Sequence, residues 1–270
     1  MPHKGGALWY TGKMTEPSTP EAIITFCGWL RELVGRRREN TAIVHYPVAR
    51  RASVKDVIEA LGVPHTEVGR LTTNGQEIDF GYLLAPGDSL TVAPLTPPVD
   101  VTIPTLLRPQ PLPAARFLID HNVAKLATRL RMAGFDTLFN PEWHDETLAG
   151  ECGCQQRILL TRDLQLLKRK AVEHGHLVRE EQPTRQLAEI LHFYGISAQV
   201  RPFGRCLRCN TVLHEVAKAE ILHHLEPLTK KYYHSFRRCP GCGRIYWAGS
   251  HYAKMAQLLA ELARYQPLPY

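Results

Sequence analysis

At 270 residues the chain is longer than one typical domain, so we expect two or three domains. Hydrophobic residues make up 44% and charged residues 22%, as in soluble globular proteins, and no apolar run reaches the roughly 18 residues that a membrane span needs. The net charge of +7 is uneven, with 10 basic against 11 acidic residues in 1–100 and 23 against 15 in 101–270, which favours a polyanionic partner such as nucleic acid for the second part.

The first segment, residues 1–20, mixes Pro, Gly, Thr and Lys and lacks the apolar core of a secretory signal. We therefore expect a disordered lead and no membrane partner. Seven cysteines are present, and four of them form the paired motif described below. The three that remain are an odd number, which suits a reducing cytoplasm better than a disulfide framework. The expected location is cytoplasmic.

Residues 21–96 alternate short strands with one helix. Ser53 is expected to cap a helix over 54–61, where apolar residues recur at helical spacing. Asn74-Gly75 is typical of a hairpin turn. The expected strands are 23–26, 42–46, 71–73, 77–78 and 89–93. This order of elements predicts a β-grasp domain.

The hairpin turn and the run PGDSLTV at 86–92 resemble the ubiquitin-like sulfur carriers of thiamine and molybdopterin synthesis. Those carriers end in a diglycine whose carboxylate is activated, whereas this chain continues through Val92-Ala93-Pro94-Leu95. Sulfur transfer is therefore not expected. A docking or scaffolding role, with a protein partner, remains.

Seven prolines fall between Pro94 and Pro113. Each proline fixes φ and removes a backbone donor, so neither a helix nor a sheet strand can run through this stretch. We expect residues 97–114 to form an extended linker.

Residues 115–200 alternate strands and helices. The expected strands are 116–119, 136–139, 157–160 and 177–179, and the expected helices are 123–134, 145–155, 164–174 (a basic helix) and 184–194. Repeated strand–helix units imply a parallel sheet with helices on its faces. The predicted fold class is thus α/β.

Acidic residues stand where a parallel sheet collects its functional groups, beyond the carboxyl ends of the strands. Asp120 closes the first strand, Asp163 follows the third, and Asp145 opens the intervening helix. Clustered carboxylates repel one another unless a cation neutralises them, and hard oxygen ligands suit magnesium or manganese rather than zinc. Such ions can activate water against a phosphodiester.

The alternative interpretation is that each aspartate only caps a helix, which is the commoner role of a single residue of this kind. Asp145 and Asp163 both precede expected helices, and Asp120 precedes the helix at 123–134. The combination of three acids favours catalysis over capping.

Two CxxC pairs, Cys206/Cys209 and Cys239/Cys242, supply four thiolates at the spacing of a tetrahedral zinc site. A closed shell of four sulfurs indicates a structural metal. We expect a zinc ribbon over 201–256 and a C-terminal tail over 257–270, with four unrelated thiols as the alternative.

Several of these runs together resemble the Mut-seven C-terminal RNase family. They are RFLID at 116–120, LATRLRMAGFDT at 126–137, ILLTRD at 158–163, RCLRCN at 205–210 and RCPGCGRIYWAGSH at 238–251. The family resembles PIN-type nucleases with an added zinc ribbon, and some members carry a ubiquitin-like domain in front. The resemblance spans roughly residues 21–256.

This resemblance implies a metal-dependent ribonuclease, PIN-like in fold, with Asp120, Asp145 and Asp163 as its catalytic acids. PIN-type sites often use a fourth acid, which would be Glu180 or Glu181 here. His121-Asn122 departs from the expected pattern, because polar residues stand where apolar or small ones are expected.

Four basic residues are candidate RNA contacts: Arg129, Arg131, Arg162 and Lys168. Contacts to phosphates position the backbone without reading sequence. The alternative for Lys168 is a solvated helix face. Tyr246 and Trp247, beside the second CxxC pair, suit either stacking on unpaired bases or the core of a small ribbon.

The sequence thus predicts a ribonuclease with catalytic Mg or Mn and structural Zn, whose zinc ribbon helps to bind RNA. The rival is a non-catalytic RNA-binding or assembly module in which the acids are helix caps.

Overall fold

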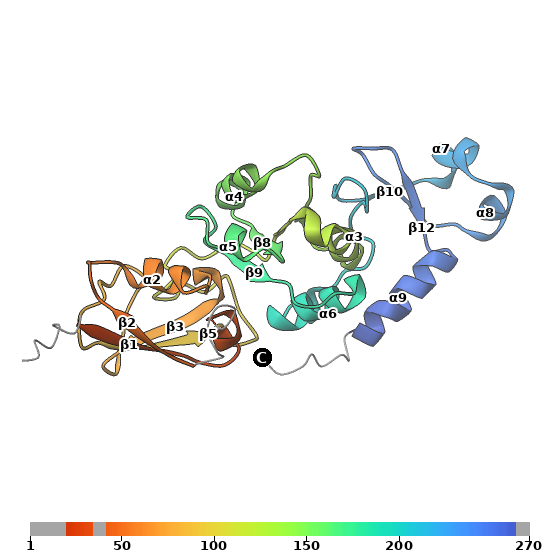
Figure 1. The fold of residues 1–270 in the computed structure, drawn as a ribbon. Helices are drawn as coiled ribbons and strands as arrows, with labels where there is room; N and C mark the ends of the chain where they lie inside the picture. Colours follow the sequence, from red (N-terminus) through yellow and green to blue (C-terminus); the bar gives the residue numbers. More distant parts are fainter. Residues whose placement is uncertain (1–19, 35–41, 263–270) are drawn as a thin grey trace, which may run out of the picture.

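A computed structural model of the chain describes residues 20–34 and 42–262. Three sheets follow one another along an elongated molecule: a mixed sheet at one end, a parallel sheet in the middle and a small antiparallel sheet at the other end (Figure 1). The predicted fold class, α/β with a β-grasp domain in front and a ribbon behind, is confirmed. The expected disordered lead lies outside the described residues except for Pro20, and so do residues 263–270 of the expected tail.

The β-grasp sheet has five strands in the order β2-β1-β5-β3-β4, and β1 pairs with β5 in parallel. Ser53 caps the main helix as predicted, because its hydroxyl accepts the backbone N–H of Asp56. The elements are β1 Glu21–Phe26, α1 Leu30–Val34, β2 Ile43–Pro47, α2 Val54–Ala60, a 3₁₀ turn His65–Glu67, β3 Val68–Thr73, β4 Gln76–Glu77 and β5 Ser89–Pro94.

The hairpin turn between β3 and β4 is also as predicted. Asn74 has φ 49° and Gly75 has φ 83°, so both residues lie in the left-handed region that a two-residue hairpin turn requires.

The proline-rich segment contains neither helix nor strand, but it is packed rather than open. Leu107 joins the core of the β-grasp domain, whereas Leu112 joins the core of the parallel-sheet domain. Between them Arg108 is buried, and its guanidinium donates hydrogen bonds of 2.8–3.1 Å to the carbonyls of His65, Thr66 and Val68. We call residues 97–114 the strap.

The parallel sheet has the order β7-β6-β8-β9. Successive residues of β6 enter different cores, with Phe117 and Ile119 against α3 and α6, and Leu118 against α4 and α5. A sheet covered on both faces in this way is apolar throughout its strands. The elements are β6 Phe117–Ile119, a 3₁₀ turn His121–Val123, α3 Ala124–Ala133, β7 Thr137–Leu138, α4 Asp145–Cys154, β8 Ile158–Thr161, α5 Leu164–Leu167, β9 Gly175–Leu177 and α6 Pro183–Phe193.

Two expected elements of this domain are wrong in extent. The basic helix expected at 164–174 ends at Leu167, because the N–H of Lys168 closes the last turn and the chain then bends to bury Val172. The strand expected at 177–179 is β9 and lies two residues earlier.

The β-grasp domain contacts the parallel sheet through buried polar groups. Glu67 is fully buried, and its Oε1 accepts the backbone N–H of Leu177 in β9 at 2.5 Å. His65 Nε2 lies 2.8 Å from the carbonyl oxygen of Val172. The two domains therefore meet in an interface rather than across a flexible joint.

The last part of the chain forms an antiparallel sheet of order β10-β11-β12 and a long helix. The elements are a 3₁₀ turn Ser197–Gln199, β10 His214–Val216, α7 Lys218–Ile221, a 3₁₀ turn Leu222–His224, α8 Pro227–Tyr232, β11 Phe236–Arg238, β12 Ile245–Trp247 and α9 Ser250–Leu262. α9 passes through the expected boundary at 256/257, and Leu259 and Leu262 pack into the core of the parallel-sheet domain. The expected tail is therefore helical up to Leu262.

Replacing Arg108 by Met should lower the free energy of unfolding by about 3 kcal/mol or more, because three buried carbonyls lose their donor at once. Chemical denaturation measures this change. Arg51→Met, at an exposed position, is the matched control and should stay within about 0.5 kcal/mol of the parent. Equal stabilities of the two variants would contradict the structural role of the strap.

Candidate active site and metal centre

The order of the parallel strands creates one switch point in the sheet. The chain runs from β6 outward to β7 and then returns to place β8 on the other side of β6. Ligands bind at such a point, outside the carboxyl ends of the two strands where the direction of winding reverses. Asp120 directly follows β6, and Asp163 stands two residues after β8.

Asp120 is 1% exposed, and both oxygens of its carboxylate accept hydrogen bonds. Oδ1 accepts the backbone N–H of His121 at 2.6 Å and lies 2.8 Å from Nδ1 of the same histidine. Oδ2 accepts Asn122 Nδ2 and Thr161 Oγ1, both at 2.6 Å. A buried carboxylate needs such donors, since an unpaired one is costly to bury. The His121 side chain is 73% exposed, so it contacts this buried carboxylate from the solvent side.

Thr161 and Asn122 join the two strand ends. The Thr161 hydroxyl donates to Asp120 and accepts the backbone N–H of Asp163 at 2.9 Å. Asn122 Oδ1 accepts the backbone N–H of Arg162 at 3.1 Å. The structure thus links Asp120 and the loop that carries Asp163 through shared partners.

The side chain of Asp163 also caps α5. Oδ1 accepts the backbone N–H groups of Gln165 and Leu166 at 2.7 and 3.3 Å. Its second oxygen has no hydrogen-bond partner among the described residues. The carboxylate therefore keeps one oxygen available while it serves as a cap.

Asp145 lies apart from this network. It is the first residue of α4, and its Oδ2 lies 3.7 Å from Arg169 NH2 in a half-exposed ion pair. The helix cap is His144, whose side chain makes no capping hydrogen bond. Within the described residues, the three aspartates do not converge closely enough to share one ion.

The segment that holds the two candidates for a fourth acid is tied to the same edge of the sheet. Arg162 NH1 donates to the carbonyl oxygen of Glu180 at 3.1 Å, and the backbone N–H of Glu180 is bound by Glu189 Oε2 at 3.0 Å. Glu181 is exposed beyond it. The contact brings the Glu180 backbone, rather than that of Glu181, against the loop that carries Asp163.

The four expected RNA contacts have different surroundings. Arg162 is exposed beside Asp163, and Arg129 is half-buried on α3. Arg131 is only 5% exposed and donates to the carbonyls of Thr137, Leu207 and Arg208, so its guanidinium is engaged inside the protein rather than at the surface where a phosphate contact was expected. Lys168 Nζ donates to the carbonyl of Glu59 at 2.8 Å, so it joins the domains instead of forming the solvated face of a helix.

The candidate metal centre consists of Cys206, Cys209, Cys239 and Cys242, whose sulfur atoms all lie within 4.8 Å of one another. Two sulfur–sulfur distances are 3.5 and 3.4 Å, close to the edge of about 3.8 Å that a tetrahedron with Zn–S bonds of 2.3 Å would have. A hydrogen bond from Thr211 lowers the pKa of the Cys209 thiol to about 6, which favours the thiolate that zinc requires. These residues fit zinc.

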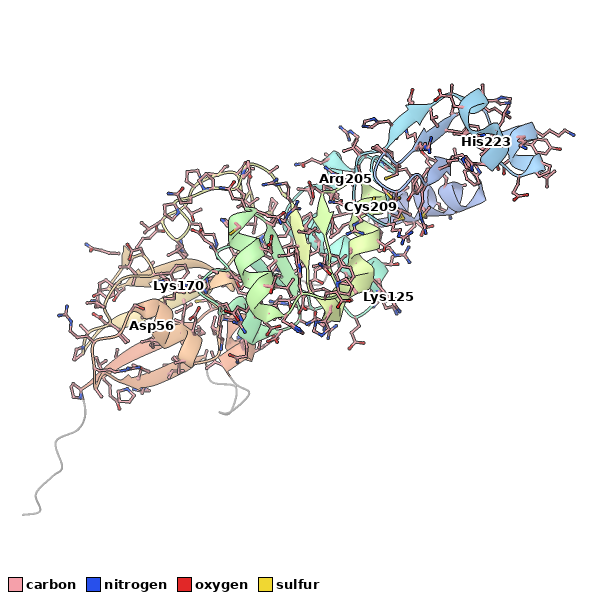
Figure 2. The ribbon with its side chains drawn as sticks, turned by 90° about the horizontal axis from the view of Figure 1, so that it is seen from above. Asp56, Lys125, Lys170, Arg205, Cys209 and His223 are labelled. Atoms are coloured by element: carbon pink, nitrogen blue, oxygen red, sulfur yellow. The ribbon has the colours of Figure 1, made fainter. Side chains whose placement is uncertain are left out.

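The cysteine cluster is joined to the parallel sheet. The side chain of Asn210 accepts the backbone N–H of Thr137 in β7 and donates to Asp136 Oδ1 at 2.9 Å. Asp136 also pairs with Arg157 at 2.7 Å and with Arg205 at 3.5 Å. In Figure 2, Arg205 and Cys209 accordingly lie between the parallel-sheet domain and the far end of the ribbon, which is marked by His223.

Sequence reasoning missed the two uncharged residues that organise the site. In the sequence, Thr161 stands out only as part of the run ILLTRD at 158–163, and Asn122 only as a polar residue where an apolar or small one is expected. Both follow apolar strand residues at the carboxyl edge of the sheet, and this position was a signal available from the sequence.

Comparison with protein-family models gives two matches. Residues 115–259 match the Mut7-C RNAse domain, and residues 19–100 match the Mut7-C ubiquitin domain. No curated protein and no solved structure matches the chain significantly. In the two described ranges, no helix combines the length and the apolar character needed to cross a bilayer.

The purified chain should contain one zinc ion, and Cys239→Ser should lose it and melt at a lower temperature, because bound zinc contributes on the order of 10 kcal/mol to folding at such sites. Metal analysis and thermal melting measure both effects. Cys154→Ser, at an exposed thiol on α4, should keep the zinc. A Cys239→Ser protein with a full complement of zinc would contradict the assignment.

Asp136 should make the junction of ribbon and sheet sensitive to acid. Burial alone would raise the pKa of its carboxyl, but hydrogen bonds from Arg157 and Asn210 outweigh burial and hold the pKa below its ordinary value of 3.8. A carboxyl with a lowered folded-state pKa stabilises the fold fully above the ordinary value, and this contribution is lost as the pH falls through the folded-state pKa.

Asp136→Asn should therefore cost about 2 kcal/mol at pH 7, as measured by denaturation, and progressively less below about pH 4. Glu142→Gln, at an exposed acid nearby, serves as the control. A cost that does not change with pH would show that the charge of Asp136 is not what holds the junction.

Proposed function

Since this chain belongs to the Mut7-C RNAse domain family, we propose that it is a ribonuclease whose reaction takes place at the carboxyl edge of the parallel sheet. The family match covers the parallel-sheet domain, the cysteine cluster and most of α9. The proposal assigns hydrolysis of RNA phosphodiester bonds to this domain and RNA binding to its basic surface.

One observation supports this assignment most strongly. Asp120 is a buried carboxylate held by three side chains at the switch point of the sheet, and its partner Thr161 also fixes the loop of Asp163. A simple helix cap needs only backbone N–H groups. The side-chain hydrogen bonds from Asn122 and Thr161 restrict the orientation of the carboxylate, which is what a catalytic group requires.

The chemistry of the donors fits a hard divalent cation, Mg²⁺ or Mn²⁺. The second oxygen of Asp163 would hold it, together with Asp120 Oδ1 once the exposed His121 ring turns away from that oxygen. Mg²⁺ commonly takes one or two protein carboxylates and completes its shell with water and substrate phosphates. We keep Asp145 as the third proposed acid, which stands apart from this pair in an ion pair with Arg169. When bound, such an ion acts as a Lewis acid toward the phosphate and makes a water molecule more acidic.

The remaining residues of the site bind and orient the substrate. Arg162 extends from the loop between Thr161 and Asp163, where it is well placed for a substrate phosphate. Arg129 provides a second cation from α3. We assign Glu180 as the fourth acid, because its backbone is held against Arg162. No Ser or Cys nucleophile is needed for this reaction.

The two outer parts of the chain have supporting roles in this proposal. The zinc ribbon binds RNA. The ubiquitin-like domain binds a protein partner, because Ile23 on β1 and Ile43 on β2 are 42% and 52% exposed on neighbouring strands of its sheet. Four thiols reserved for zinc suit the reducing cytoplasm, where we place the protein.

A non-catalytic RNA-binding or assembly module is the second candidate. The observation that favours it is the capping of α5 by Asp163 and the hydrogen bond from the His121 N–H to Asp120. In that case the acids would only end strands and begin helices.

Incubation of labelled RNA, structured and unstructured, with the zinc-loaded protein and Mn²⁺ or Mg²⁺ distinguishes the two candidates. Cleavage should require the added ion and fall at least about 100-fold in Asp120→Asn and in Asp163→Asn, because each variant removes a charge that would hold the cation. Glu77→Gln, at an exposed acid on β4, should cleave like the parent.

Melting curves and zinc content of the variants show whether they fold. Tight RNA binding with no cleavage under any of these conditions would instead establish the binding module. Cleavage by Asp120→Asn at the parent rate would remove the site from consideration.

A further inference from the structure

A cleft of about 490 Å³ lies where the ribbon sheet meets the start of α9. Its walls come from the ends of β10 and β12, the beginnings of β11, α7 and α9, and the turn at Phe203. The cleft is therefore separate from the carboxyl edge of the parallel sheet. Its volume lies within the range of about 300–1,000 Å³ that is usual for ligand sites.

Aromatic side chains form the walls of this cleft. Trp247 is 40% exposed at the end of β12. Tyr252 stacks on Phe203 with ring centroids 4.5 Å apart and an angle of 30° between the planes. Gly249 lies against the Trp247 indole, and a Cβ there would be 2.9 Å from Nε1, so the glycine lets the ring lie close to the backbone.

Cationic and polar groups accompany these rings. Arg237 and His234 are exposed lining residues of the cleft, and Arg237 NH1 donates to the carbonyl of Phe203 at 3.1 Å, which fixes the guanidinium beside the aromatic wall. Glu215 is the acidic residue among the residues that line the cleft. The surrounding ribbon, residues 201–249, carries nine Lys and Arg against three Asp and Glu.

We propose that this cleft binds an unpaired nucleotide of a single-stranded RNA segment, with its base stacked on Trp247 and its phosphate near Arg237. Every base has a π-face, so stacking of this kind binds single strands with little dependence on sequence. A base inside a duplex is already stacked and paired, and side chains cannot reach it readily through the narrow major groove of A-form RNA. A single strand can therefore place a base on Trp247, whereas a duplex cannot.

This inference rests on the proposed ribonuclease function and names its substrate class. The ribbon is joined to β7 through Asn210, so a strand held in the cleft is held in a fixed relation to the parallel sheet. The cleft would act as an anchor for the single-stranded part of the substrate, while cleavage takes place elsewhere on the molecule.

Binding of a fluorescein-labelled single-stranded 12-mer RNA of mixed sequence, and of the same strand in a duplex, tests the proposal. Anisotropy is measured with the full-length zinc-loaded protein and without added Mg²⁺ or Mn²⁺. Trp247→Ala should weaken single-strand binding by about tenfold, and Trp247→Phe should restore most of it. Tyr232→Ala removes a ring that is 61% exposed on α8 and is not a lining residue, so it should bind like the parent.

Zinc content and melting temperature control for the folding of Trp247→Ala. If this variant is unstable, crosslinking of a 4-thiouridine-labelled RNA to the parent protein provides a second readout, with adducts expected on Trp247 or Tyr252. Equal binding by Trp247→Ala and the parent, or equal affinity for single strand and duplex, would overturn the proposal. So would crosslinks found only outside the cleft.

The outcomes separate this inference from the proposed function. RNA binding that depends on Trp247 without any cleavage would leave the cleft standing and refute the nuclease. Cleavage by the parent, with full RNA binding by Trp247→Ala, would support the nuclease and refute the role of the cleft.

Discussion

The hydroxyl of Thr161 is the contact on which the organisation of the candidate site depends. It donates to a carboxylate that is almost completely buried and accepts the backbone N–H of Asp163, the residue that caps α5. A buried charge is tolerated only when it is hydrogen-bonded, so Asp120 is held at the end of β6 by donors from β8 and from its own turn. The same hydrogen bonds that make burial possible also restrict the direction in which the carboxylate oxygens point.

The two edges of the parallel sheet are covered by side chains from the neighbouring parts of the chain. At one edge the N–H of Thr137 in β7 is bound by Asn210 of the first CxxC turn. At the other edge the N–H of Leu177 in β9 is bound by Glu67 of the β-grasp domain. Exposed strand edges invite pairing with other chains, and here each edge provides an attachment for another domain instead. The three parts are thus connected through the backbone of one sheet.

Local signals in the sequence predicted local structure well. Ser53 and Asn74-Gly75 act through their own backbone or that of close neighbours, and the four cysteines share one chemistry, so these features could be identified without knowledge of the fold. The alternation of apolar strands and helices likewise predicted the parallel sheet. The end of α5 could not be predicted, because the bend after Leu167 serves to bury Val172 in the core beneath α4, among residues distant in the sequence.

Charged residues were predicted less well, because their partners are distant in the sequence. Arg131 looks like a surface residue in a helical pattern, but two of the three carbonyls that it binds belong to a turn more than seventy residues away. Lys168 has its partner more than a hundred residues earlier. For the acids, the sequence predicted that Asp120 and Asp163 follow the carboxyl ends of β6 and β8, and they do. The uncharged residues that fix them became visible only in three dimensions.

The strap has a consequence for how the chain can be divided. Residues 101–114 fall between the two family matches and belong to neither. Yet Arg108 completes one domain, and Leu112 completes the other. A cut after residue 100 leaves the β-grasp domain without Arg108, and a cut before residue 115 leaves the parallel-sheet domain without Leu112. Each domain produced alone therefore has to include residues 101–114.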